Sequence, residues 1–444
     1  MHNDFEHKPI PRSHREGFLS MFLIMMGYTF FSAAMLVGGK LGVGMTMEGL
    51  LTAVVIGISI LVAYTGVMAW IAGRTKLSLH LLSRYAFGEN GSHIPSFILA
   101  VTQTGWFGVG LSIFAIPVAL VCQNMPILEG TWFLQGDTMA IISDDVTIPK
   151  HLLYSIVIAA GVVMTSSAYW GIRGLSIVSG VAVPSIVCLG LYSVIKALFI
   201  DHPVSIGAMK NGWEFMLAYS PRSSLGLGAA VSIVVGAFIS GGTCTPDITR
   251  YARSARVATT TTVMAYLFGA TTMFLFGAVG AIVYNQADIS LVLEMQGLLG
   301  AGIVVLSLNV WTTNDNTLYT SGLGLANITG LPKRFMVLLS GFFGTFSAVW
   351  IYNNLVDWLN ILNTIIPPVG AVLIVDYFCL NNSAYSDIHS ARRVKVRWTA
   401  VAAWACGAFV ALLSSGVLGV VVPVIHYGVP AVNGMIATVV VMLI

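Results

Sequence analysis

Two short stretches, each inside a long apolar segment, decide how this chain folds. Residues 30–34 read Phe-Phe-Ser-Ala-Ala, and residues 238–242 read Phe-Ile-Ser-Gly-Gly. Both follow one pattern: a phenylalanine, an apolar residue, a serine and two small residues. Serine and glycine weaken a helix, so the pattern predicts a helix break at both places. Close helix packing through small residues is the alternative.

The composition excludes a soluble globular protein. Of the 444 residues, 57% are hydrophobic and only 9% are charged, whereas soluble domains contain roughly 25% charged residues. Many apolar stretches reach the ~20 residues that cross a bilayer as a helix. We therefore expect an all-α polytopic membrane protein. The spans contain no paired acids, no His-rich metal cluster and no activated nucleophile, so we expect neither an enzyme nor a nucleic-acid-binding protein.

Hydropathy predicts twelve transmembrane spans in four segments. Residues 1–16 form an N-terminal segment, 17–199 hold spans 1–5 with an outer loop at 123–150, 200–380 hold spans 6–10, and 381–444 hold a loop and spans 11–12. The predicted spans are 17–38, 48–72, 95–122, 151–170, 175–199, 225–249, 258–284, 297–325, 335–353, 355–380, 396–416 and 418–444.

The distribution of basic residues predicts the orientation. If the connections alternate sides, 16 of the 21 Lys and Arg residues lie on the side of the N-terminus and 5 on the other. Lys and Arg accumulate in cytoplasmic loops. Both termini are therefore expected in the cytoplasm.

The two opening stretches then lie in spans of opposite direction. Span 1 runs outward and span 6 runs inward, and five spans separate their starts. This is the arrangement of an inverted five-helix repeat. Paired interrupted spans in corresponding halves point to a transporter binding site, because irregular backbone at membrane depth is tolerated only inside protein or along a cavity.

Polar and aromatic residues are expected to converge on that site. Gln103 and Trp106 are three residues apart and share one helix face, which suits a planar, neutral ligand rich in heteroatoms. Phe238 can supply a second aromatic surface, and Ser240 can supply a hydrogen bond. The backbone of Ala237 and Gly241 is expected to add more. For Gln103 alone, an interhelical hydrogen bond is an equal alternative.

Span 8 contains the densest polar cluster. Asn309, Thr312 and Thr313 share one face and offer only neutral oxygen ligands, which hard cations prefer. Carbonyl groups of Gly27 and Phe30, freed at the span 1 break, can complete the shell. The pattern therefore predicts a sodium site, although threonine hydroxyls also bond back to the preceding helical turn.

Asp315 is the one acid placed well inside a span, and intramembrane acids are functional candidates. We expect it to form a gate or a structural ion pair with Arg250 or Arg253, with proton coupling as the alternative.

At these residues the sequence resembles the bacterial cytosine permeases of the nucleobase–cation symporter family. The similar stretches run through nearly all of the chain to about residue 380. They are GYTFFSAAM (27–35), TQTGWFGVG (102–110), VVGAFISGGT (234–243), LNVWTTNDN (308–316), GLGLANITG (322–330) and IPPVGAVLIVDY (366–377).

The resemblance implies a LeuT-like fold, with ten helices in inverted repeats, discontinuous helices 1 and 6, and two further helices. It implies a sodium-coupled cytosine importer that works by alternating access, as a monomer, in the bacterial inner membrane. Another nucleobase, a hydantoin-like ring or proton coupling is the alternative. The implied substrate-binding residues are Gln103, Trp106, Phe238, Ser240, Ala237, Gly241, Phe31, Asn309 and Asn314, and the implied sodium ligands are Gly27, Phe30, Asn309, Thr312 and Thr313.

Overall fold

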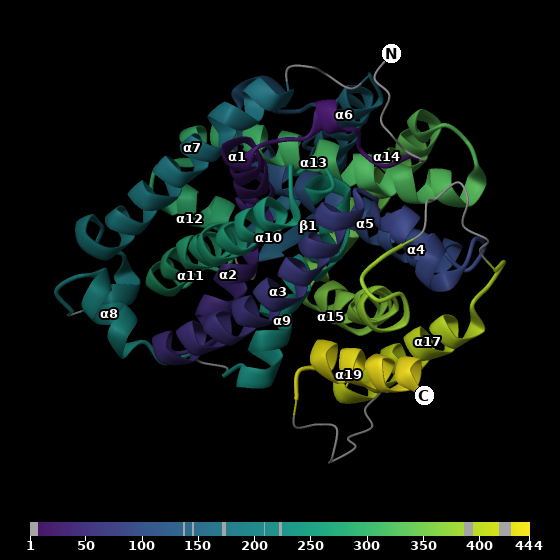
Figure 1. Cartoon of the computed structure of the whole chain (residues 1–444). Helices are drawn as coiled ribbons and strands as arrows, with labels where there is room; N and C mark the ends of the chain where they lie inside the picture. Colours follow the sequence, from purple (N-terminus) through teal and green to yellow (C-terminus); the bar gives the residue numbers. More distant parts are fainter. Residues whose placement is uncertain are drawn as a thin grey trace.

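The computed structural model describes residues 8–135, 138–143, 146–170, 175–207, 209–221, 224–385, 394–416 and 428–444. The described chain is almost entirely helical, as expected (Figure 1). Its helices are α1 (Phe18–Thr29), α2 (Ser32–Gly44), α3 (Met47–Thr75), α4 (Leu79–Phe87), α5 (His93–Cys122), α6 (Lys150–Trp170), α7 (Leu175–Ile195), α8 (Gly212–Ala218), α9 (Leu227–Thr249), α10 (Ala255–Met264), α11 (Thr271–Tyr284), α12 (Ile289–Met295), α13 (Leu299–Thr329), α14 (Lys333–Asn353), α15 (Leu355–Ile365), α16 (Pro367–Val375), α17 (Trp398–Ser414) and α19 (Pro430–Leu443).

Short elements complete the chain. Three π-helical turns, η3 (Lys196–Ile200), η5 (Ala265–Ala270) and η6 (Asp376–Leu380), continue α7, α10 and α16, and three 3-10 turns are η1 (Arg12–His14), η2 (Pro126–Leu128) and η4 (Val204–Ile206). The predicted outer loop 123–150 holds an antiparallel hairpin of β1 (Met139–Ser143) and β2 (Val146–Pro149), in which Ala140 faces Ile148.

Within the described residues, eight helices are long and apolar enough to cross a membrane, and the bent pair of α1 and α2 makes nine. Three more helices overlap predicted spans 8, 11 and 12, although residues 418–427 of span 12 lie outside the described residues. Of these, α13 has 31 residues but carries the polar cluster at its middle, and α17 and α19 are short. The order of the helices follows the sequence prediction.

The central helices come from both halves of the sequence. Helix α13 packs along α5, α2 along α11, and α3 along α9 and α10. The C-terminal helices α17 and α19 pack on each other and on α16, at one edge of the bundle (Figure 1). This places the α1–α2 junction, α5, α9 and α13 around one interior region.

Glycine allows α2 and α11 to approach closely. A Cβ at Gly38 would lie 2.1 Å from the Phe274 carbonyl oxygen, and one at Gly277 would lie 1.8 Å from the Met35 carbonyl oxygen. No larger residue fits at either position with this backbone. Such contacts hold helices together in lipid, where hydrophobic burial contributes little between them.

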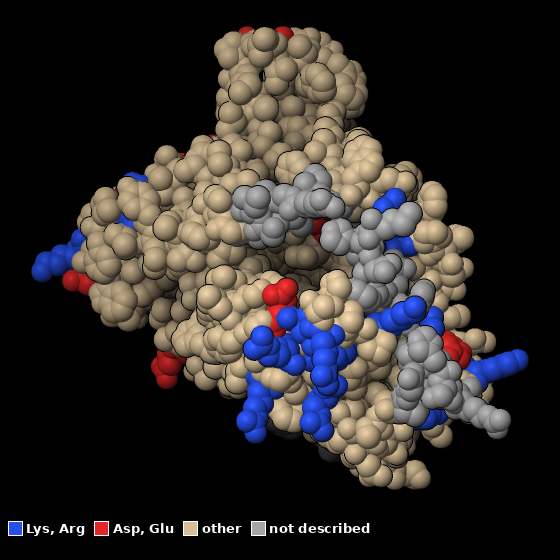
Figure 2. All heavy atoms as spheres, turned by 45° about the horizontal axis from the view of Figure 1, so that its top comes forward, with Lys and Arg blue, Asp and Glu red and all other residues tan. Residues whose placement is uncertain are grey.

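Charged side chains are unevenly spread over the surface. Figure 2 shows most Lys and Arg side chains in its lower half, whereas the part that projects at the top shows only a few acidic side chains. Between them the visible surface is mostly tan, with a few charged side chains at its left and right edges. This asymmetry accords with the uneven count of basic residues between the two sides.

Candidate functional site

The first predicted break is present. Helices α1 and α2 meet at Phe30 and Phe31 with a bend of 48°. Phe30 leaves the helical region at φ −77° and ψ 71°, and Phe31 is extended at φ −110° and ψ 123°. The Phe31 N–H, which a continuous helix would direct to the Gly27 carbonyl, donates instead to the Thr29 carbonyl at 2.9 Å. The Gly27 carbonyl therefore loses its helical donor.

Asn309 of α13 hydrogen-bonds to the backbone on both sides of this break. Its side-chain nitrogen donates to the Phe30 carbonyl at 2.6 Å, and its side-chain oxygen accepts from the Ser32 N–H at 2.9 Å. The amide is buried, with 1% of the residue exposed. A buried backbone group without a partner costs about 1–3 kcal/mol, so this one side chain satisfies the two groups that the break exposes.

The two threonines of the cluster turn to the same point of α13. The hydroxyls of Thr312 and Thr313 donate to the Asn309 carbonyl at 2.9 and 2.8 Å. Both hydroxyls thus bond back to the preceding helical turn, which is the alternative that the sequence left open. The lone pairs of both hydroxyl oxygens remain available to an ion. The result is a cluster of neutral oxygens on the residues of α13 that follow Asn309, which itself contacts the break, a donor set that fits a hard monovalent cation.

The prediction of a second helix break is wrong. Helix α9 is continuous from Leu227 to Thr249, through the whole stretch 236–242. Its polar residues bond within the helix: Thr243 donates to the Ile239 carbonyl at 2.9 Å and Thr245 to the Gly241 carbonyl at 3.4 Å. The glycines admit neighbours instead, because a Cβ at Gly242 would lie 2.7 Å from the Thr65 methyl carbon. Close packing explains this stretch.

A cavity lies beside the α1–α2 break. The space between its walls amounts to about 380 Å³, counting the part that opens outward, but only about 30 Å³ of it admits the centre of a water molecule. That is room for roughly one or two waters, so a larger ligand requires side chains of the walls to move. It is lined by Tyr28, Phe31, Gln103, Trp106, Ala237, Phe238, Ser240, Gly241, Thr313, Asn316 and Thr317. Seven of the nine residues predicted to bind substrate line this cavity.

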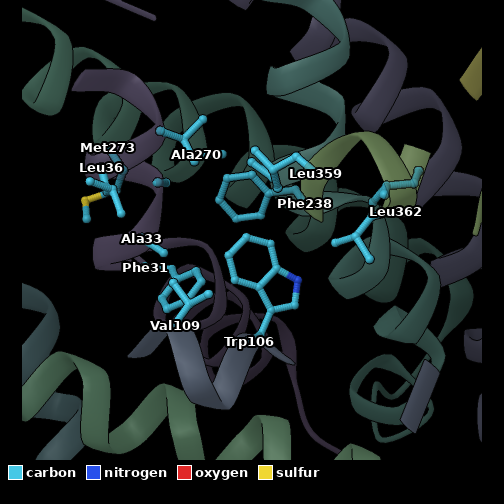
Figure 3. Close-up of a cluster of buried hydrophobic side chains, with 14 of the residues drawn as sticks. Phe31, Ala33, Leu36, Trp106, Val109, Phe238, Ala270, Met273, Leu359 and Leu362 are labelled. Atoms are coloured by element: carbon cyan, nitrogen blue, oxygen red, sulfur yellow. The ribbon is translucent and has the colours of Figure 1, made fainter. Parts of the chain in front are cut away.

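Aromatic rings form two of its walls. Figure 3 shows Trp106 and Phe238 pointing toward each other from α5 and α9, with Phe31 beside Trp106. The Phe31 and Trp106 rings meet edge to face at 5.6 Å between centroids, and Phe238 meets Tyr266 in the same way at 5.6 Å. These edge contacts fix both flat rings.

Two hydrogen bonds join α5 to α9 across the polar side of the cavity. The Trp106 indole N–H donates to the Ser240 hydroxyl oxygen at 2.8 Å, and the Gln103 amide nitrogen donates to the Cys244 sulfur at 3.6 Å. Gln103 and Trp106 are about one turn apart on α5, and Cys244 and Ser240 are about one turn apart on α9 in the opposite direction, as expected for antiparallel helices. Both partners of Trp106 and Gln103 on α9 are buried.

Two asparagines predicted near the substrate lie elsewhere. Asn309 is at the break and does not line the cavity. Asn314 is fully buried between α5 and α6, where its amide donates to the Phe107 carbonyl at 3.4 Å and to the Met164 sulfur at 3.3 Å. Its neighbours Asn316 and Thr317 line the cavity instead, because successive residues of a helix point about 100° apart.

The expected ion pair of Asp315 is also wrong. Its carboxylate accepts a hydrogen bond from Ser167 of α6 at 2.9 Å, and Ser167 in turn accepts from the Trp311 indole at 3.0 Å. Arg250 is buried at the end of α9 and donates to the Asp247 carbonyl and the Tyr319 hydroxyl. A hydroxyl of α6, rather than an arginine, thus holds Asp315.

Sequence reasoning missed four residues around the cavity. Tyr28, Asn316 and Thr317 line it, and Cys244 contacts Gln103. The signal for two of them was present, because Asn316 and Thr317 follow Thr313 at i+3 and i+4 on one face. Among the described residues, no group of three or more His, Cys, Asp or Glu gathers to hold a metal ion.

The chain matches known proteins over nearly its full length. Residues 9–436 match the family described as permease for cytosine/purines, uracil, thiamine, allantoin. A cytosine permease of Escherichia coli K12 is 41% identical over 405 residues, covering 91% of this chain and 88% of the relative. A purine-uracil permease of Arabidopsis thaliana is 22% identical over 340 residues, covering 68% and 51% of the two chains.

Solved structures match the fold. Mhp1, a nucleobase-cation-symport-1 family transporter, was solved closed with bromovinylhydantoin bound; it has a TM-score of 0.75 at 19% identity and covers 98% of this chain and 93% of that one. Mhp1 in its inward-facing conformation has a TM-score of 0.77 at 16% identity, covering 98% and 92%. A Na⁺-coupled sialic acid symporter has a TM-score of 0.63 at 11% identity, covering 97% and 89%.

These matches confirm the predicted fold class, and the structure itself has helix 1 broken and helix 6 continuous. The permease relatives show that the chain is a multi-pass membrane transporter. By its sequence over residues 9–436, it belongs to the family of permeases for cytosine/purines, uracil, thiamine and allantoin.

Proposed function

We propose that this permease imports cytosine together with sodium by alternating access. The observation that carries the proposal is the cavity between Trp106 and Phe238, which adjoins the helix break held by Asn309. The 41% identity to a cytosine permease supports cytosine as the substrate. Cytosine is planar, and Gln103 and Ser240 line the same cavity as the two rings, so a base that entered between the rings would have polar groups beside its edge.

In the proposed complex, cytosine stacks between Trp106 and Phe238. Ser240 and Gln103 hydrogen-bond its edge, and Phe31 closes the cavity on the side of the break. Because α9 is continuous, the backbone groups of Ala237 and Gly241 remain in the helix. These two residues contribute by their small size, which leaves room for the ring beside Phe238.

Sodium is proposed to bind between α1 and α13. Its ligands would be the carbonyl oxygens of Gly27, Phe30 and Asn309 and the hydroxyl oxygens of Thr312 and Thr313. Thr313 also lines the cavity, so the two sites share a residue. An ion there stabilises the break and thus the position of Phe31 against Trp106. Coupling of this kind is reciprocal, because each ligand must raise the affinity for the other by the same factor.

The exposed side chains indicate which side of the cavity is open. Asn316 of α13 is exposed although it lines the cavity, and Gly27 and Tyr28 of α1 are partly exposed. On the other side of the break, Leu36 and Val37 of α2 are buried. We further propose that both termini lie in the cytoplasm and that the protein acts as a monomer in the bacterial inner membrane. The open side of the cavity would then face the cytoplasm.

The test is uptake of radiolabelled cytosine into proteoliposomes with an inward Na⁺ gradient. We expect accumulation by the native protein and its loss, by at least about tenfold, in Thr312→Ala/Thr313→Ala, since two of the ligands are removed. The matched control is Thr52→Ala/Thr260→Ala, which removes two exposed threonines with the same back-bonded geometry. Accumulation without Na⁺ would contradict sodium coupling, and no cytosine uptake by folded native protein would contradict the substrate.

A second substrate class is favoured by one finding. Mhp1 was solved with a bromovinylhydantoin bound, and a hydantoin ring is also planar and rich in carbonyl and N–H groups. Competition of the labelled uptake by hydantoins and by uracil separates these candidates.

A further inference from the structure

The α5–α9 hydrogen bonds also orient the groups that face the cavity. The Gln103 amide carries a donor nitrogen and an acceptor oxygen on the same planar end. Its nitrogen donates to the Cys244 sulfur at 3.6 Å, and that thiol is buried, with 2% of the residue exposed. The amide oxygen accepts no hydrogen bond from any described residue, and Gln103 lines the cavity. The oxygen is therefore wholly available to a ligand, whereas the nitrogen retains only its second N–H.

The neighbouring pair, Trp106 and Ser240, leaves a hydrogen-bond donor rather than an acceptor for a ligand. The Ser240 oxygen accepts from the Trp106 indole at 2.8 Å. A hydroxyl that accepts one bond still has its proton to donate. Side by side, Ser240 thus presents a donor to the cavity and Gln103 presents an acceptor.

This order of donor and acceptor distinguishes amino from oxo pyrimidines. In cytosine, ring atom N3 accepts and the adjacent 4-amino group donates, so N3 pairs with Ser240 and the amino group with Gln103. In uracil the same two positions are reversed, with N3–H donating and O4 accepting. Uracil in this orientation would place a carbonyl oxygen against the Gln103 oxygen, unless the amide rotated by 180°.

We infer that Cys244 is a positioning residue that holds the Gln103 amide in one orientation, and that this makes the cavity selective for 4-aminopyrimidines over 4-oxopyrimidines. The inference rests on the proposed function and deepens it. Cys244 lies outside the lining of the cavity, so it acts through Gln103. Sites that hydrogen-bond a polar substituent reject analogues lacking the match, because a buried polar group is left unpaired.

The experiment measures selectivity as the ratio of the uracil inhibition constant to the cytosine KM in proteoliposome uptake. Cys244→Val, which matches the thiol in size, is expected to lower this ratio at least about fivefold, with cytosine uptake retained. Cys244→Ser restores a hydrogen-bonding group and is expected to keep the ratio within about twofold of native. Cys406→Val, at an exposed cysteine of α17, is the matched control.

A double-mutant cycle separates positioning from packing. If Cys244 acts through Gln103, Cys244→Val should lower the ratio no further in a Gln103→Ala background. Should Cys244→Val fail to fold, Cys244→Ala carries the same prediction.

An unchanged ratio in a Cys244 variant that transports cytosine, or an additive effect in the cycle, would overturn the inference and leave the proposed function standing. Native protein that takes up no cytosine would overturn the proposed function itself.

Discussion

The α1–α2 junction and α9 share one sequence pattern but differ in structure. At Phe30–Ala34 the helix breaks, and at Phe238–Gly242 it continues. The difference lies in what surrounds each stretch. Asn309 reaches across from α13 and satisfies the groups exposed at the first stretch. At the second, hydroxyls bond back within α9 and the glycines take up neighbouring side chains.

The comparison teaches that weak helix formers permit a break without causing one. In the membrane, freed backbone groups need partners from protein. A side-chain amide has both a donor and an acceptor, so a single asparagine can satisfy both backbone groups exposed at a helix break.

Removing that amide should give the largest effect. Asn309→Ala leaves the Phe30 carbonyl and the Ser32 N–H without their partner, at about 1–3 kcal/mol each. We expect cytosine uptake to fall at least about 100-fold and the midpoint of thermal unfolding to drop by several degrees. Uptake assays and thermal unfolding of the purified protein measure both.

Asn433→Ala, on the C-terminal helix α19, is the control for loss of a membrane asparagine. Near-native uptake in Asn309→Ala would contradict the role of the amide. It would mean that the contact with Asn309 does not explain why the first stretch breaks and the second does not.

A smaller effect is expected in α9. A Cβ at Gly241 would lie 2.6 Å from the Tyr28 hydroxyl oxygen, so Gly241→Ala must displace a side chain that lines the cavity. We expect a rise of about three- to tenfold in the cytosine KM, with little change in unfolding temperature because alanine favours helix.

Gly228→Ala, in the same helix, has open space around its added Cβ and should be neutral. A large loss of folded protein in Gly241→Ala, unlike Gly228→Ala, would instead indicate that the stretch needs a non-helical backbone.

The sequence predicted the architecture because composition and hydropathy act over whole helices. The order of the helices, the first break and the meeting of Gln103, Trp106, Phe238 and Ser240 were all predicted correctly. Hydropathy averages over about 20 residues, so it is insensitive to the details that decide one side chain.

What failed depended on contacts between distant segments. The continuity of α9 depends on neighbours such as Thr65 and Tyr28, which no local pattern identifies. Asp315 meets Ser167 of α6 because of how α6 packs on α13. Asn316 lines the cavity and Asn314 does not, because the two side chains point about 200° apart around the helix. Residue type alone cannot predict which of them faces the cavity.

The most direct test of the central claim, that an ion at the α1–α2 break shapes the adjacent cavity, is equilibrium binding. Cytosine affinity of the purified protein would be measured with Na⁺ and with an equal concentration of choline, at constant ionic strength. We expect Na⁺ to tighten cytosine binding at least about fivefold, a coupling of roughly 1 kcal/mol or more, and cytosine to tighten Na⁺ binding by the same factor. Equal cytosine affinities in the two media would contradict the account.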